Sequence, residues 1–114
     1  VYTVDPSTGV ATLAATLAAD ATDQTLPFAA IAGTRLGVDF NPTVDRLRVV
    51  SNSGQNLRIN VDTGATITDG LLTLAGGASV SAAAYTNSFD GATATQLWVL
   101  NGTDNRLYLQ NPPN

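Results

Sequence analysis

One stretch of this sequence occurs twice. Residues 47–64 align without gaps on residues 97–114, and apolar residues coincide along the alignment. The coincident pairs are Leu47 with Leu97, Val49 with Val99, Leu57 with Leu107, and Ile59 with Leu109. A repeat with a period of about 40–50 residues is typical of solenoids and propellers, in which a single repeat cannot bury its apolar face alone. The repeat therefore favours an array of small units that cover one another.

The side chains available for chemistry are few. The sequence has no Cys, Met or His, and it also lacks Lys and Glu, so its five basic residues are all Arg and its nine acidic residues all Asp. These absences exclude Cys–His pairs, Ser–His–Asp triads, Schiff-base lysines and histidine metal sites. We therefore expect a protein that is not an enzyme and needs no cofactor.

The charge pattern also limits the partners. A net charge of −4 with five dispersed Arg argues against nucleic acid, which requires a basic patch to displace counterions. No apolar run reaches the roughly 20 residues that span a bilayer, so we expect no membrane insertion. Charged residues make up only 12% of the chain, against about 25% in average proteins. A neutral, Thr- and Asn-rich β chain is common among secreted proteins, so we expect an extracellular or cell-surface bacterial protein.

Short apolar runs separated by turn residues predict strands along the whole chain. The expected strands are residues 1–4, 10–17, 36–40, 46–50, 56–60, 65–68, 80–86, 96–100 and 106–110. Four short antiparallel strands in about 35 residues are typical of a propeller blade. The predicted fold class is all-β, with propeller-like repeats of four-stranded antiparallel sheets, and Tyr85 takes the place of Phe40 in the second repeat.

The strands divide residues 1–114 into parts of a single β-repeat domain. These parts are a partial blade over 1–17, an irregular link over 18–34, a full blade over 35–68, a link over 69–79, and a partial blade over 80–114. The first link contains Leu26-Pro27-Phe28, which we expect to plug a core edge. If the four strands of a blade are lettered A to D in chain order, the three groups of strands read C-D, A-B-C-D and A-B-C. Incomplete sheets are therefore expected at both ends.

Incomplete sheets have open edges, and open uncharged edges invite strand addition by another chain. We therefore predict that the chain's partners are other copies of itself. The candidate self-association strands comprise Val1, Tyr2, Thr3, Val4, Arg106, Leu107, Tyr108, Leu109 and Gln110.

Several segments resemble a known family. They are residues 37–42, 45–51, 54–58, 83–87 and 107–114, among which F-N-P…D-R-L-R-V-V-S is the most specific phrase. This pattern resembles domain-of-unknown-function (DUF) family 4394, secreted and mostly bacterial proteins with a β-propeller-like repeat. The resemblance implies no catalytic residues, because the family carries no established activity. It also implies a segment of a longer protein, or a short member that completes its sheets with neighbours.

The segment Asp62-Thr63-Gly64 has the form of an aspartic protease signature. Those enzymes need two Asp that share a proton at a two-fold axis, which a homodimer would supply. The alternative is a hairpin turn, in which Asp accepts backbone hydrogen bonds and Gly adopts a positive φ. The other repeats place ordinary turn residues at the same position, so we favour the turn.

Other polar residues also have two interpretations. Asp39, Asp45, Asp62 and Asp104 at strand ends are candidate Ca²⁺ ligands, but they lack the clustering that Ca²⁺ prefers and are better read as turn residues. A second set could line a groove that binds an anionic or sugar ligand. Alternatively, these residues could pair with Asp39, Asp45 and Asp104 or cover apolar surface with their aliphatic stems, and we favour this structural role. This set is Arg46, Arg48, Arg58 and Arg106.

The aromatic residues Trp98, Tyr2, Tyr85 and Tyr108 could stack on sugars, but packing between units is the favoured role. The leading hypothesis is thus a non-enzymatic extracellular structural protein, whose unfinished sheets are completed by neighbouring copies in a ring or filament. The alternatives are a ligand- or glycan-binding segment of a longer propeller and, more remotely, an aspartic protease-like homodimer that uses Asp62.

Overall fold

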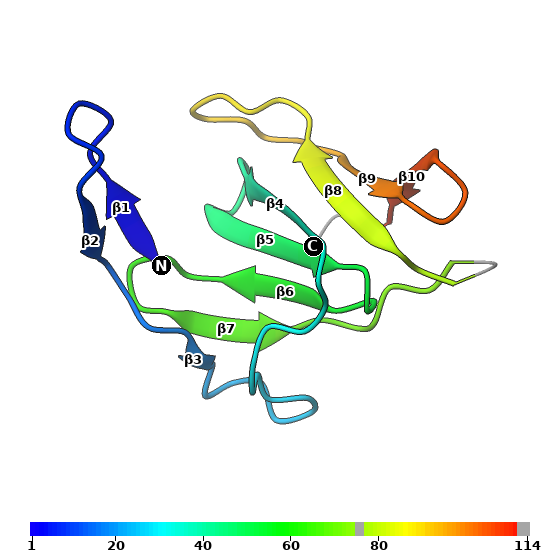
Figure 1. The fold of residues 1–114 in the computed structure, drawn as a ribbon, viewed down its shortest axis with the longest axis horizontal. Helices are drawn as coiled ribbons and strands as arrows, with labels where there is room; N and C mark the ends of the chain where they lie inside the picture. The colour runs from blue at the N-terminus through cyan, green and yellow to red at the C-terminus, as the bar shows by residue number, and fades with distance from the viewer. Residues whose placement is uncertain (75–76, 112–114) are drawn as a thin grey trace.

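The computed structural model describes residues 1–74 and 77–111, and this part of the chain is all-β, as predicted (Figure 1). It has no helix, and so none that is long and apolar enough to cross a membrane. The strands are β1 Tyr2–Val4, β2 Ala11–Leu13, β3 Ala18–Ala19, β4 Leu36–Asn41, β5 Arg46–Ser51, β6 Asn56–Ile59, β7 Ala65–Thr68, β8 Val80–Tyr85, β9 Leu97–Asn101 and β10 Arg106–Gln110. The predicted strands agree closely with β4 to β10, but the strand predicted over residues 10–17 is limited to β2. The propeller-like arrangement stays a prediction.

A five-stranded sheet with the order β3-β7-β6-β5-β4 contains the predicted four-stranded unit. The pairs from β4 to β7 are all antiparallel, and β4 and β5 pair from Leu36 opposite Ser51 to Asn41 opposite Arg46. The fifth strand, β3, pairs with β7 in parallel. It comes from the segment predicted to be an irregular link, so the link contributes a short strand to the sheet.

A three-stranded sheet with the order β10-β9-β8 repeats the first three strands of that unit. Tyr85 pairs with Leu97 as Phe40 pairs with Leu47. This register confirms that Tyr85 stands where Phe40 stands in the other unit. The two units therefore correspond, strand by strand, as β4 with β8, β5 with β9, and β6 with β10.

The second half of the gapless alignment is wrong by one residue. Leu57 pairs with Val49, but Val99, the counterpart of Val49, pairs with Tyr108 rather than Leu107. The cause is turn length: residues 51–55 separate Val50 from its partner Asn56, whereas residues 101–106 separate Leu100 from its partner Leu107. Because side chains alternate between the faces of a strand, a shift of one residue reverses the face of each side chain.

The main core lies between the two larger sheets. It contains Val50 from β5 and Val80, Tyr85, Leu97 and Val99 from the three-stranded sheet, with Leu72, Ala83 and Tyr108 packed around it. The backbones come closest at Gly37 of β4. A Cβ at this glycine would lie 2.5 Å from the carbonyl carbon of Ala82 and from the nitrogen of Ala83. The absence of a side chain therefore permits the two sheets to approach.

A second core lies on the opposite face of the five-stranded sheet. Val49, Leu57 and Ile59 are buried there beneath Val1, Leu17, Phe28 and Leu47. The plug expected at Leu26-Pro27-Phe28 is confirmed for Phe28, whereas Leu26 is 50% exposed. The N-terminal segment thus covers this face through a few anchored residues, while its hairpin β1–β2 is a separate two-stranded sheet with exposed strands that stands apart in Figure 1.

A buried carboxylate fixes the link between β3 and β4. Asp23 accepts hydrogen bonds from the backbone nitrogens of Thr68 at 2.9 Å, Leu26 at 3.2 Å and Thr25 at 3.3 Å. These donors favour the charged form, and that from Thr68 contributes most to lowering the pKa of Asp23 below its ordinary value. The link is therefore attached to β7 by a charged acceptor.

The contact at Gly37 can be tested by adding one methyl group. We expect Gly37→Ala to lower the free energy of unfolding by about 1–3 kcal/mol, the usual cost of overpacking, because the methyl would meet backbone atoms that cannot rotate away. Gly70→Ala is the matched control, since a Cβ at Gly70 has nothing within 4 Å. Urea denaturation measures both, and equal stability of the two variants would contradict the close approach.

Candidate functional site

A charged group lies buried where the two larger sheets meet. The Arg48 side chain is only 1% exposed. Its Nε donates to the Tyr85 hydroxyl at 3.2 Å, and its Nη1 donates to Asn56 Oδ1 at 2.7 Å and to Asp69 Oδ2 at 2.6 Å. The guanidinium therefore joins β5, β6, β8 and the segment after β7.

Asp69 serves two arginines. Arg58 Nη2 donates to Asp69 Oδ1 at 2.8 Å, and Arg58 Nε donates to Oδ2 at 2.9 Å, while Oδ2 also accepts from Arg48. The predicted pairing of these arginines with Asp39, Asp45 and Asp104 is wrong. Asp69 was missed because it follows the last strand of its unit, in a segment that reads as a linker.

Asp39 supports the same junction from β4. Its Oδ2 accepts from the backbone nitrogen of Tyr85 at 2.7 Å, and its Oδ1 accepts from the nitrogen of Phe40 at 2.8 Å. Tyr85 is thus held at its backbone by Asp39 and at its hydroxyl by Arg48. Since Nε and Nη1 of Arg48 and the carboxylates of Asp39 and Asp69 are engaged within the protein, this network has a structural role.

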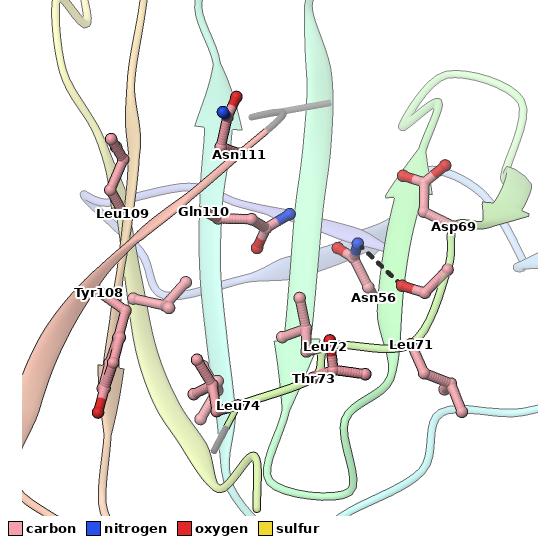
Figure 2. Close-up of a pocket in the computed structure, with 13 residues that line it drawn as sticks. Asn56, Asp69, Leu71, Leu72, Thr73, Leu74, Tyr108, Leu109, Gln110 and Asn111 are labelled. Carbon is pink, nitrogen blue, oxygen red and sulfur yellow. Dashed lines mark hydrogen bonds between the residues drawn. The ribbon is translucent and has the colours of Figure 1, made fainter.

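A hollow of about 400 Å³ lies beside the network, between β10 and the segment after β7 (Figure 2). Its wall combines apolar side chains with amides, and Gln110 extends from β10 toward Asn56. The Gln110 Oε1 atom is buried and has no hydrogen-bond partner. The side chains drawn and labelled are Asn56, Asp69, Leu71, Leu72, Thr73, Leu74, Tyr108, Leu109, Gln110 and Asn111.

The acidic residues proposed as Ca²⁺ ligands do not form one cluster. Asp39 and Asp45 line an open hollow of about 510 Å³ together with Asp90, but within residues 1–74 and 77–111 no three acidic side chains are grouped as a metal site. Asp104 lies in the β9–β10 turn and accepts from Tyr108, which lowers the pKa of Asp104 and raises the pKa of Tyr108.

The segment Asp62-Thr63-Gly64 is the turn between β6 and β7, as favoured from the sequence. Gly64 has a φ of +77°, and a Cβ there would lie 2.0 Å from the Thr16 carbonyl oxygen. The expected acceptor was Asp62, but Asn60 Oδ1 accepts from the backbone nitrogens of Asp62 and Thr63 at 3.0 and 3.4 Å. Asp62 itself is exposed.

The candidate self-association strands lie at two separate places. Tyr2, Thr3 and Val4 form β1 of the exposed hairpin, while residues 106–110 form β10, an edge strand of the three-stranded sheet. Val1 differs from the rest, because it packs on the second core and its ammonium group donates to the Ala15 carbonyl at 2.7 Å.

The outer face of the three-stranded sheet is apolar. The pairing of β8, β9 and β10 places six side chains on this face, which points away from the main core. They are Ala82, Ala84, Trp98, Leu100, Leu107 and Leu109. Packing between units holds for Tyr85, but Trp98 is 36% exposed on this face, and no strand in the described part of the chain covers it. The sequence signal for this face is the turn before β10, which is one residue longer than the corresponding turn between β5 and β6.

Comparison with known proteins gives one match. Residues 1–114 match a family described as Domain of unknown function (DUF4394). No curated protein and no solved structure matches the chain.

Removing the Arg48 guanidinium tests its role in joining the sheets. We expect Arg48→Met to lower the free energy of unfolding by about 3 kcal/mol, as is usual when one partner of a buried ion pair is removed. Arg46→Met is the matched control and should change stability by less than about 0.5 kcal/mol, because Arg46 is exposed and donates to the carbonyls of Val44 and Asp45. Denaturation in guanidinium chloride measures the free energy of unfolding of both variants, and a loss for Arg48→Met as small as that for Arg46→Met would overturn this role.

Proposed function

We propose that this chain, which belongs to the DUF4394 family along its whole length, has a structural role. In this role it is extracellular and non-enzymatic, and neighbouring copies complete its unfinished sheets. One observation carries the proposal. Within residues 77–111, the β8–β9–β10 sheet has three strands where the corresponding unit β4–β7 has four. Strand β10 is therefore an edge at the position where the other unit continues into β7.

The chemistry of this edge suits strand addition. The nitrogen of Gly102, just beyond the end of β9, donates to the carbonyl oxygen of Ser79 on the β8 side. In an antiparallel ladder, successive residues direct their N–H and C=O groups to alternate sides, so this bond fixes which residues of β9 face β8 and which face β10. By that alternation, we expect the N–H and C=O groups of Leu107 and Leu109 to face the open side of β10. The strand carries one charge, Arg106 at its start, and no Pro, so it lacks the usual protection of an edge.

The N-terminal hairpin supplies a second open element. Strands β1 and β2 pair only with each other, and their residues are all exposed. An isolated two-stranded hairpin is marginally stable in water, so joining another sheet would stabilise it. A ring or a filament of copies would satisfy both β10 and this hairpin.

The composition supports a role without catalysis outside the cell. Arg and Asp are the only charged residue types, and the buried Arg48 is paired with Asp69, which also pairs with Arg58. Few charges and many Thr and Asn residues are typical of secreted β proteins. An aspartic protease-like dimer would need two copies of the exposed Asp62 turn to meet, and the contact of Gly64 with Thr16 supports a turn role instead.

The open edge predicts a difference between two substitutions at one position. Leu109→Pro removes the outward N–H and should weaken self-association about fivefold more than Leu109→Ala, which keeps that donor. One hydrogen bond contributes about 1 kcal/mol, and about 1.4 kcal/mol corresponds to a tenfold change in affinity. Analytical ultracentrifugation at micromolar concentrations measures both variants beside the unchanged protein. The proposal fails if the unchanged protein stays monomeric or if the two variants associate equally.

A ligand-binding function is the second candidate, and the unpaired Gln110 Oε1 in the hollow of Figure 2 favours it. A neutral polyhydroxylated ligand such as a glycan would offer the missing donor. We expect such a ligand to raise the Tm of the unchanged protein and of Gln96→Leu, a matched control at an exposed residue outside the hollow, but not of Gln110→Leu. Without binding, Gln110→Leu should simply be more stable by about 1 kcal/mol, because a buried unpaired acceptor is removed. A panel of neutral oligosaccharides that leaves every Tm unchanged would dispose of this candidate.

A further inference from the structure

The packing of the two larger sheets provides a template for an interface between copies. Inside the chain, the inner face of β4 and β5 meets the inner face of β8 and β9. The first inner face carries Gly37, Asp39, Arg48 and Val50. The second carries Ala83, Tyr85, Leu97 and Val99.

Each of these inner faces has a counterpart elsewhere in the same chain, and the counterpart of the second is exposed along β4 only, because Leu47 and Val49 of β5 belong to the second core. Ala82 pairs with Leu100, and Ala84 with Trp98, as Gly37 pairs with Val50 and Asp39 with Arg48. The outer face of the three-stranded sheet is thus the repeat of the inner face of β4 and β5. In the same way, the outer face of β4 repeats the inner face of β8, because Phe40 corresponds to Tyr85 and Val38 to Ala83.

We infer that the outer face of the three-stranded sheet docks on the outer face of β4 in a second copy, repeating between chains the packing within each chain. This inference rests on the self-association proposed above and names the surfaces that it uses. The β4 surface consists of Leu36, Val38 and Phe40, which are 40%, 50% and 45% exposed. Its partner surface is the apolar outer face that contains Trp98.

The charge and the hydroxyl of the template disappear from the two surfaces together. Arg48 donates to the hydroxyl of Tyr85 inside the chain, and at the corresponding positions Trp98 would meet Phe40, which has no hydroxyl. Burial of this pair therefore leaves no charge and no hydroxyl without a partner.

The backbone nitrogen of Phe40, which corresponds to that of Tyr85 in the template, already has a hydrogen-bond acceptor. Asp39 accepts from the nitrogen of Tyr85 inside the chain, whereas its counterpart Ala84 has no acceptor. The nitrogen of Phe40, however, is already bonded to Asp39 of its own strand at 2.8 Å. The proposed interface therefore has the matched, apolar character that stable burial requires.

The exposure of these side chains is the energetic reason for docking. Trp98 and Leu100 are each 36% exposed, Leu107 is 65% and Leu109 is 47% exposed. A contiguous apolar patch of this kind marks an interaction site in soluble proteins. Ala82 has the methyl group that Gly37 lacks, so the strands of two copies would lie farther apart than β4 and β8 do, and the bulk of Trp98 and Leu100 fills that added space.

A second copy is the occupant because one chain carries both complementary surfaces. The two surfaces differ, so the contact is heterologous: the head of one copy meets the tail of the next. Such contacts extend to a ring or a filament, and they stop at a two-subunit complex when a surface is blocked.

Blocking one surface at a time tests this arrangement. In Phe40→Asp the β4 surface is blocked, and in Trp98→Asp the outer face of the three-stranded sheet is blocked. Each variant alone should be monomeric in analytical ultracentrifugation, while an equimolar mixture should form a two-subunit complex and nothing larger. Leu26→Asp, at an exposed residue of the link, is the control and should assemble like the unchanged protein.

Circular dichroism and Tm confirm that the variants are folded, and Phe40→Thr with Trp98→Thr, which keep strand propensity, replace any that are not. If the unchanged protein assembles and the blocked variants assemble equally well, the docking surfaces are wrong while strand completion stands. A mixture of the two variants that remains monomeric also overturns head-to-tail docking. If the unchanged protein is monomeric, the proposed self-association fails together with this inference.

Discussion

The buried guanidinium of Arg48 is the interaction on which the arrangement of the two larger sheets depends. A charge removed from water is costly unless it is paired and hydrogen-bonded, and Arg48 finds its partners on three different segments: Asn56, Asp69 and Tyr85. Since those partners must converge on one point, they fix the position of β8 and of the segment after β7. The apolar core between the sheets then packs around a junction whose geometry is already specified.

The sequence predicts the strands well and their mutual relations less well. Turns rich in Gly, Asn, Asp and Pro mark where each strand ends, so the bounds of β4 to β10 agree with the expected ranges to within a residue or two. The alignment of β6 on β10 is off by one because a gapless alignment cannot show that one turn holds an extra residue. The partner of Arg48 was missed for a different reason: long-range pairing places Asp69 beside β5, and local patterns do not report it.

The N-terminal part shows the same limit. Two short strands with a turn were predicted and are present as β1 and β2, but their separation from the larger sheets depends on contacts far apart in the sequence. Val1, Leu17 and Phe28 cover the second core, and β3 joins β7 in parallel. Parallel pairing has no local turn to announce it, so a segment with only two residues in a strand reads as an irregular link.

The turn before β10 shows how a small change in a repeat array can alter its surface chemistry. One more residue in this turn than in its counterpart places Leu107 and Leu109 on the outside of the sheet and Tyr108 on the inside. The composition of the strand is the same in either register, so the amount of apolar surface offered to neighbours is set by loop length alone. Insertions and deletions in turns are usually regarded as neutral. In such arrays they would change how much apolar surface is available for association with neighbours.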